Sequence, residues 1–236
     1  MEYLDGLRAV KSICFELSNI CNYSIAHRKC PLHNVKGKNT LPTQIITKTI
    51  EELGEINYSG SIAFHNYNEP LIDPRLFYLS RYAKNICKNS IVRLTTNGYY
   101  LTQNLADELK SHGIDDVTIS LYSESEAERL KNIRFSDIVP SFYAHGLDDR
   151  ENIYTGPQIP CCLPCYSLST EVIVRHTADV ALCCLDWDSR YTFGNLGTSS
   201  LQDILTSSTV REVQNDLQQG QRTLEICKRC DWQRGI

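Results

Sequence analysis

Strand-like and helix-like segments alternate through residues 11–131, and this alternation predicts an α/β fold with a mostly parallel sheet. Two further observations shape the prediction. Polar motifs follow each of the first four expected strands, which is where parallel sheets carry their chemistry. Ten of the eleven cysteines gather in three groups, and two of these groups mark a cysteine-rich region after residue 150.

The expected elements follow from hydrophobic periodicity and from turn residues. Apolar runs predict strands at 11–17, 61–65, 91–96, 116–121 and 141–145, and helical spacing predicts helices at 43–55, 75–88, 105–112 and 123–131. Farther on, a β-hairpin is expected from 169–176 and 179–184, a turn at 194–197 and an amphipathic helix at 199–219. We therefore expect two domains, residues 1–150 and 151–236.

The composition excludes several classes of protein. Hydrophobic residues make up 42% of the chain and charged residues 22%, as in ordinary globular proteins. The net charge of −4 argues against a broad nucleic-acid-binding surface, which is normally basic. No signal peptide is recognisable, and no apolar stretch approaches the ~20 residues needed to cross a bilayer. We expect a cytoplasmic protein that binds neither nucleic acid nor membrane.

The cysteines indicate metal or cluster binding. Secreted disulfide scaffolds are usually short, whereas this chain is long and lacks a secretion signal. The segment CFELSNICNYSIAHRKCPLH (14–33) holds three cysteines and two histidines, and thiolates are the preferred ligands of iron–sulfur clusters. The closing Cys227-Lys-Arg-Cys230 fits a cluster or, as the alternative, a structural zinc site.

Four motifs at the ends of expected strands resemble those of the radical S-adenosylmethionine (SAM) superfamily. They are ELSNICN (16–22), NEP (68–70), TTNG (95–98) and VTISLYS (117–123). The resemblance covers residues 11 to about 125 and implies a truncated parallel (β/α) partial barrel. The cysteine-rich region resembles the SPASM or twitch-type auxiliary subdomain of that superfamily, a small unit of a β-hairpin and a helix that holds a second iron–sulfur cluster.

The resemblance also assigns residues to the expected site. It implies that SAM is contacted by Asn68, Glu69, Thr96, Asn97 and Ser120, with Glu69 accepting from the SAM ammonium group. The auxiliary cluster is expected on Cys165, Cys183, Cys227 and Cys230, with Cys162 as a substitute for Cys165. Tyr122, at the expected barrel mouth, and Cys87, which stands outside the three groups, are the candidate catalytic residues.

The first cluster departs from the superfamily pattern of Cys-x₃-Cys-x₂-Cys. Cys21 and Cys30 are expected ligands, but the positions that should follow Cys21 hold Ile25 and Arg28. The preferred solution is Cys21-x₅-His27-x₂-Cys30, with His27 as the middle ligand. The alternatives take His33 or Cys14 as the third ligand, or leave the loop with two cysteines and no third ligand.

The resemblance implies an enzyme with two [4Fe–4S] clusters that cleaves SAM to a 5′-deoxyadenosyl radical, which abstracts a substrate hydrogen atom. An auxiliary cluster with four cysteines favours oxidation of a small sugar-like or cyclitol-like molecule, with an external electron donor such as flavodoxin or ferredoxin. Redox-neutral epimerisation with a spare thiol and peptide modification are the alternatives among enzymes. A non-catalytic iron–sulfur or zinc-binding module is the alternative outside them.

Overall fold

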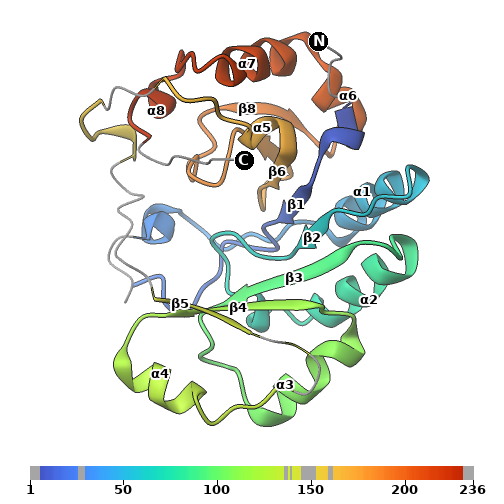
Figure 1. Ribbon diagram of the computed structural model, residues 1–236, viewed down its shortest axis with the longest axis vertical. Helices are drawn as coiled ribbons and strands as arrows, with labels where there is room; N and C mark the ends of the chain where they lie inside the picture. Colours follow the sequence, from blue (N-terminus) through green and yellow to red (C-terminus); the bar gives the residue numbers. More distant parts are fainter. Residues whose placement is uncertain are drawn as a thin grey trace.

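The computed structural model describes residues 6–25, 30–135, 138, 140–144, 153–158 and 162–230. One eight-stranded sheet organises the chain, with strand order β5-β4-β3-β2-β1-β6-β7-β8 (Figure 1). The strands are β1 (Ser12–Phe15), β2 (Ser61–Ala63), β3 (Ile91–Thr96), β4 (Asp116–Leu121), β5 (Ser141–Ala144), β6 (Glu171–Val174), β7 (Asp179–Ala181) and β8 (Thr192–Asn195).

All pairs from β5 to β6 are parallel, whereas β6–β7 and β7–β8 are antiparallel. The parallel part matches the expected partial barrel, and the antiparallel strands belong to the cysteine-rich region. The hydrogen-bonded ladder between β1 and β6 runs from Ser12 opposite Glu171 to Phe15 opposite Val174. The sheet therefore continues without a break across the expected domain boundary at residue 150, and that division of the chain stays a prediction.

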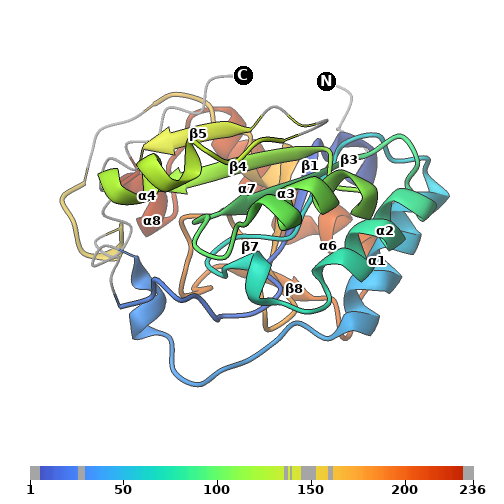
Figure 2. The ribbon, with the colours of Figure 1, turned by 90° about the horizontal axis from the view of Figure 1, so that it is seen from below.

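The helices cover the outer face of the sheet and its cysteine-rich end (Figures 1 and 2). They are α1 (Thr43–Glu55), α2 (Leu76–Ile86), α3 (Gln103–Leu109), α4 (Glu124–Leu130), α5 (Ser167–Thr170), α6 (Leu201–Thr206), α7 (Ser208–Gln218) and α8 (Glu225–Lys228), with short 3₁₀ segments η1 (Gly6–Ala9), η2 (Pro31–Asn34), η3 (Pro70–Ile72) and η4 (Lys110–His112). No helix in these described stretches is both long and apolar enough to cross a bilayer.

Alternation along the strands separates the apolar core from the inner face of the partial barrel. Ile13 and Phe15 of β1 are fully buried in the main apolar cluster, together with Ile46 and Ile50 of α1. The neighbouring strand positions point the other way, because successive side chains on a strand alternate between its two faces. Cys14 accordingly lines the cavity described below.

The expected helix at 199–219 is two helices. Ser207 separates them and caps the second, since its side chain accepts a hydrogen bond from Val210 N at 3.3 Å. Ser200 caps the first in the same way, from Asp203 N at 3.0 Å. Each capping serine satisfies a backbone N–H that would otherwise lack a partner. The expected turn at 194–197 begins within β8.

Candidate active site and auxiliary cluster site

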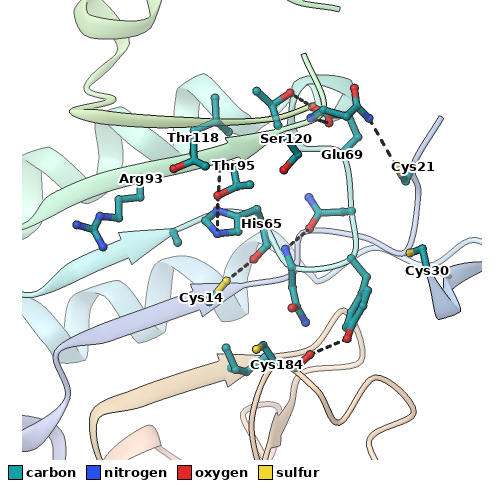
Figure 3. Close-up of a pocket in the computed structure, with 18 of the residues that line it drawn as sticks. Cys14, Cys21, Cys30, His65, Glu69, Arg93, Thr95, Thr118, Ser120 and Cys184 are labelled. Carbon is teal, nitrogen blue, oxygen red and sulfur yellow. Dashed lines mark hydrogen bonds between the residues drawn. The ribbon is translucent and has the colours of Figure 1, made fainter. Parts of the chain in front are cut away.

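A cavity of about 380 Å³ lies on the inner face of the sheet and is lined by residues of β1, β2, β3, β4 and β6 and of the loops that follow them (Figure 3). All five residues predicted to contact SAM line it, as do Cys21, Cys30 and Tyr122. The structure therefore brings to one space the residues that the sequence placed at four separate strand ends. Cavities of this volume hold small-molecule ligands and cofactors in other proteins.

Glu69 connects the loop after β2, which carries it, with the end of β3 and the loop that follows. Its carboxylate accepts hydrogen bonds from the Thr96 hydroxyl at 2.6 Å, from Asn97 N at 2.8 Å and from Leu71 N at 3.0 Å. Burial raises the pKa of the Glu69 carboxyl, and these hydrogen bonds oppose that shift. A carboxylate has about four acceptor positions, so Glu69 can accept one further donor, such as an ammonium group in the cavity.

Asn68 and Asn97 shape the rim of the cavity. The Asn68 side chain folds back on its own loop, accepting from Asn66 N at 3.1 Å and donating to Phe64 O at 3.3 Å. The Asn97 amide donates to Asn22 Oδ1 at 2.8 Å, and its nitrogen lies 3.8 Å from Cys21 Sγ. Asn97 thus joins the loop after β3 to the cysteine loop.

Cys21 and Cys30 lie close enough to influence each other's ionisation. Burial raises the pKa of the Cys21 thiol to about 12, with the nearby Glu69 and Cys30 adding to the shift. A thiolate is unfavourable there without a compensating positive charge, which iron supplies when thiolates bind it. Two thiols in the lining of one cavity could form one wall of a cluster site.

The structure separates the candidates for the third ligand. His27 lies outside the described residues. His33 is exposed, its Nδ1 lies 2.6 Å from Cys30 O, and it does not line the cavity. The Cys14 thiol does line the cavity, but it donates to His65 O, and burial, Glu171 and Cys184 raise its pKa.

The two candidate catalytic residues lie in different places. Tyr122 lines the cavity, and its ring stacks on Tyr23 with 5.3 Å between ring centroids. Cys87 is buried at the end of α2, where its thiol faces Ile50 O at 3.5 Å within the apolar core. The structure does not bring Cys87 to the cavity, because it follows a helix that packs on the opposite face of the sheet.

A second, smaller cavity of about 30 Å³ is lined by the four cysteines predicted to hold the auxiliary cluster, Cys165, Cys183, Cys227 and Cys230. They come from separate places in the fold: Cys165 lies two residues before α5, Cys183 two residues after β7, Cys227 within α8 and Cys230 two residues after α8. Cys162 is exposed and does not line this cavity. The remaining wall is mainly leucine and isoleucine, with one arginine and one serine.

The spacing of these thiols bears on which inorganic group they could hold. Within the part of the chain that the structure describes, no three His, Cys, Asp or Glu side chains meet as the ligands of a single metal ion do. Zinc requires four sulfurs at about 2.3 Å from one ion. A cluster takes each thiolate on a different iron, so its ligands surround a wider space. Four cysteines around one cavity could supply the ligands of either group.

The Cys183-Cys184 dipeptide forms a wall shared by the two cavities. Cys184 lines the larger cavity and Cys183 lines the smaller one. Tyr67, one residue before Asn68, donates its hydroxyl hydrogen to Cys184 O at 2.7 Å (Figure 3). The loop that carries Glu69 is therefore hydrogen-bonded directly to the segment that carries an expected cluster ligand.

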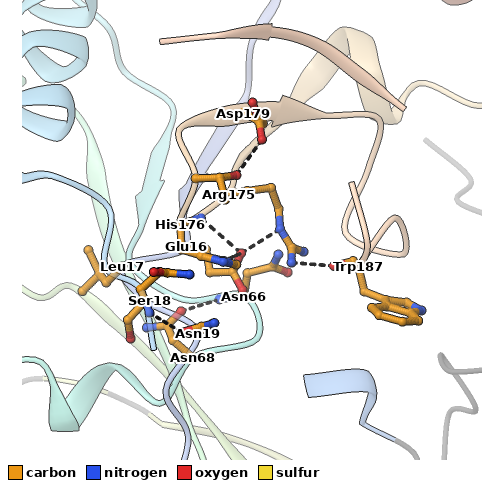
Figure 4. Close-up of polar contacts among 12 residues, drawn as sticks. Glu16, Leu17, Ser18, Asn19, Asn66, Asn68, Arg175, His176, Asp179 and Trp187 are labelled. Carbon is orange, nitrogen blue, oxygen red and sulfur yellow. Dashed lines mark hydrogen bonds and ion pairs between the residues drawn. The ribbon is translucent and has the colours of Figure 1, made fainter. Parts of the chain in front are cut away.

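A buried charged group joins the carboxyl ends of β1 and β6 (Figure 4). Glu16 and Arg175 are 0% and 2% exposed, and Arg175 Nε lies 2.7 Å from Glu16 Oε2. His176 Nδ1 lies 3.3 Å from the same oxygen, and Arg175 Nη2 donates to Trp187 O at 2.6 Å. Sequence reasoning did not find this group, since Glu16 lies 159 positions from Arg175 and 160 from His176.

The floor of the larger cavity is more polar than the sequence analysis anticipated. Arg93 and Asp116 form an ion pair at 2.9 Å between β3 and β4, and both line the cavity. His65 Nδ1 accepts from Thr95 N at 3.1 Å, and burial and then Arg93 lower the pKa of His65 to about 4. A signal was present: polar residues occupy every second position at Arg93-Thr95 and at Asp116-Thr118-Ser120.

Comparisons with known proteins agree with this architecture. Residues 165–231 match the SPASM family, an iron-sulfur cluster-binding domain. The fold is similar to that in the crystal structure of BtrN in complex with AdoMet and 2-DOIA (TM-score 0.77, 21% identity, covering 95% of this chain and 94% of that one). It is also similar to that of anSMEcpe with bound AdoMet (TM-score 0.60, 13% identity, covering 94% and 83%). The chain therefore carries a SPASM domain at residues 165–231, and as a whole it has the fold of these AdoMet-bound proteins.

Among curated proteins, the chain is similar to the S-adenosyl-L-methionine-dependent 2-deoxy-scyllo-inosamine dehydrogenase of Niallia circulans. The two are 22% identical over 233 residues, which cover 92% of this chain and 90% of that protein. That dehydrogenase therefore shares nearly the whole length of the chain, the barrel and the cysteine-rich region alike.

Proposed function

We propose that the chain is a radical SAM oxidoreductase that binds SAM and two [4Fe–4S] clusters and oxidises a secondary alcohol of a cyclitol-like or sugar-like molecule to a ketone. The observation that carries the proposal is the pair of adjoining cavities. One is lined by the residues expected to bind SAM, the other by four cysteines, and the Cys183-Cys184 dipeptide contributes one residue to each lining. The likeness to a 2-deoxy-scyllo-inosamine dehydrogenase supports the substrate class.

The reaction balances without a stoichiometric oxidant other than SAM. SAM, when bound and split with one electron, would supply the radical chemistry that removes a hydrogen atom from the alcohol carbon. The substrate would then lose the hydroxyl proton and one electron to give the ketone. The net products are ketone, 5′-deoxyadenosine, methionine and one proton, and the electron is returned. An external one-electron donor is needed to start the cycle.

The protein's own residues would bind and orient the reactants. Glu69 would accept a hydrogen bond from the SAM ammonium group, while Thr96 and Asn97 hold the Glu69 carboxylate in place. Asn68 fixes the loop that carries Glu69, and Ser120 offers a hydroxyl on the cavity wall for the SAM ribose or the substrate. Such fixed hydrogen-bonding groups are what the protein contributes when a cofactor supplies the reactivity.

For the first cluster, we propose Cys21, His27 and Cys30 as ligands. His33 lies outside the cavity, where its ring contacts Cys30 O, and Cys14 lies near Cys184. These positions favour His27 over both. Replacing His27 and His33 separately by alanine tests this. His27→Ala should lose the SAM-binding cluster, and His33→Ala should keep it; the opposite result would assign His33.

A redox-neutral epimerase is the second candidate, because two thiols, those of Cys14 and Cys184, line the larger cavity. One of them could return a hydrogen atom to the substrate radical, and the resulting thiyl radical would need one electron and one proton from an external donor. Turnover in D₂O distinguishes the two reactions. Epimerisation places deuterium on the substrate carbon, whereas oxidation yields a ketone.

Anaerobic reconstitution tests the central proposal. Iron and sulfide should each reach about eight per chain if both clusters are [4Fe–4S]. Replacing Cys183 or Cys227 by alanine should lower both counts to about four, and the matched change at exposed Cys162 should leave them at about eight. Zinc in place of iron, or no 5′-deoxyadenosine from the loaded protein with SAM and dithionite, would contradict the proposal.

A further inference from the structure

Positive charge is concentrated around the first cysteine loop. Residues 17–50 contain no aspartate or glutamate, but they contain five basic residues, Arg28, Lys29, Lys36, Lys38 and Lys48. Because the whole chain has a formal charge of −4, the remaining residues together carry −9. This asymmetry separates one basic segment from an otherwise acidic protein, and such a segment attracts acidic partners.

The structure describes part of this segment as an exposed, fixed surface, here called the basic loop (Cys30–Thr40). Lys36 and Lys38 are exposed on either side of Gly37, which turns the chain with φ of +76°. Asn19 holds the turn in place: its side chain donates to Gly37 O at 3.1 Å and accepts from Asn39 N at 2.8 Å. The two ammonium groups are thus presented by an anchored loop.

The basic loop begins at a predicted cluster ligand. Cys30 lines the SAM-type cavity, and exposed His33, three residues later, contacts Cys30 O through its ring. Figure 2 shows η2 and the chain leading from it to α1 at the periphery of the molecule. The basic loop therefore leads from an expected ligand of the first cluster to the periphery of the molecule.

Apolar side chains are exposed near the same cysteines. Ile25, four residues after Cys21, is 87% exposed. Tyr99 is 57% exposed and contacts Tyr23 edge-on, with 6.1 Å between ring centroids. Transient protein interfaces combine a few apolar contacts with charged residues at their rim.

We propose that the basic loop is the docking surface for an acidic one-electron carrier protein, which delivers the electron that starts the reaction. This inference rests on the proposed function, because it assigns a partner to the same cluster site. Complementary charge would steer the carrier to the basic loop, which begins at Cys30. Steering of this kind raises association rates by 10- to 1,000-fold and weakens as salt increases.

The test uses the reconstituted protein and an acidic flavodoxin as the probe. The variant Lys36→Glu/Lys38→Glu reverses both charges of the basic loop. The matched control, Lys11→Glu/Lys88→Glu, makes the same charge change at two exposed lysines just before β1 and near the start of β3, at the opposite ends of the strands from the cysteine loop. Binding is measured by titration at about 50 mM and about 500 mM salt, and reduction of the cluster by stopped flow.

At low salt, the loop variant should bind and accept electrons from flavodoxin about 10-fold less well than the control, and the difference should shrink at high salt. With dithionite, a small reductant that needs no docking, both variants should form 5′-deoxyadenosine at the parent rate. Equal flavodoxin affinity in the two variants would overturn the docking proposal. Failure of the parent protein to form 5′-deoxyadenosine with dithionite would instead count against the proposed function, and the binding comparison would still be readable.

Discussion

The Glu16–Arg175 pair should be among the most sensitive positions for stability, and Arg175→Met is the change that tests this. Both side chains are essentially inaccessible to solvent, and the pair links the carboxyl ends of β1 and β6. Glu16 Oε1 has no hydrogen-bond partner in the described structure, so the carboxylate depends on the contacts of its other oxygen. Removing the guanidinium leaves a buried carboxylate without its cation.

Breaking a buried pair from one side typically costs about 3–5 kcal/mol. For a chain of this size, each kcal/mol corresponds to about 2–4 °C in melting temperature, so Arg175→Met should lower it by about 6–20 °C. Replacing both partners, as in Glu16→Leu/Arg175→Met, removes the unpaired charge as well. The double variant should therefore recover most of the loss.

Urea unfolding of the four proteins of this double-mutant cycle measures the coupling between the two residues. The matched control is Lys131→Met, which breaks an ion pair of similar length, 2.6 Å to Glu128, whose side chains are 68% and 72% exposed. Exposed pairs contribute about 0–1 kcal/mol. A loss of less than about 1 kcal/mol for Arg175→Met, or a loss equal to that of the control, would refute the reasoning.

Two further predictions concern the larger cavity. Tyr67→Phe removes the hydrogen bond to Cys184 O and should lower the free energy of unfolding by about 1 kcal/mol. The matched control, Tyr58→Phe, removes a comparable hydrogen bond to Ser61 O and should have the same cost. Only Tyr67→Phe should lower the ratio of ketone to 5′-deoxyadenosine, and an equal ratio in both variants would contradict this prediction. His65 has a folded-state pKa of about 4, below its ordinary value of 6.5, so the unfolded chain binds a proton that the folded chain does not, and stability should fall as pH drops from about 6.5 towards 4. Because the ring faces an open cavity, we expect the loss of stability to be smaller than the ~3 kcal/mol that corresponds to the full pKa shift. In His65→Gln, the urea midpoint should depend less on pH between these values. An unchanged pH dependence of the midpoint would refute the assignment.

Much of the fold could be predicted because local signals and tertiary demands agree. The strand predicted at 116–121 is β4 to the residue, and the helix predicted at 43–55 is α1. Both have clear periodicity, and the parallel arrangement followed from their alternation. The helix at 199–219 was wrong in its continuity, since the Thr206-Ser207-Ser208 run offered a second cap that periodicity alone did not reveal.

The candidate site was predictable where motifs mark strand ends, and less so elsewhere. Glu69, Asn97 and Cys21 were found because each lies in a short recognisable sequence. Arg93 was missed as a cavity residue because the face to which a strand residue points is known only once the neighbouring strands are placed. Cys87 was placed among catalytic candidates on chemistry alone, and nothing in its local sequence revealed that α2 carries it into the core.

The pairing of β1 with β6 has a consequence for how the protein can be divided. β6 is an interior strand, bordered by β1 on one side and β7 on the other. A chain ending before β6 would leave β1 as an edge, with its backbone N–H and C=O groups unpaired beside an apolar core. Unprotected edges of that kind invite pairing between molecules and aggregation. The SPASM region therefore also supplies β6, the strand that pairs with β1 and covers its edge. Removing the region as an independent module would expose that edge.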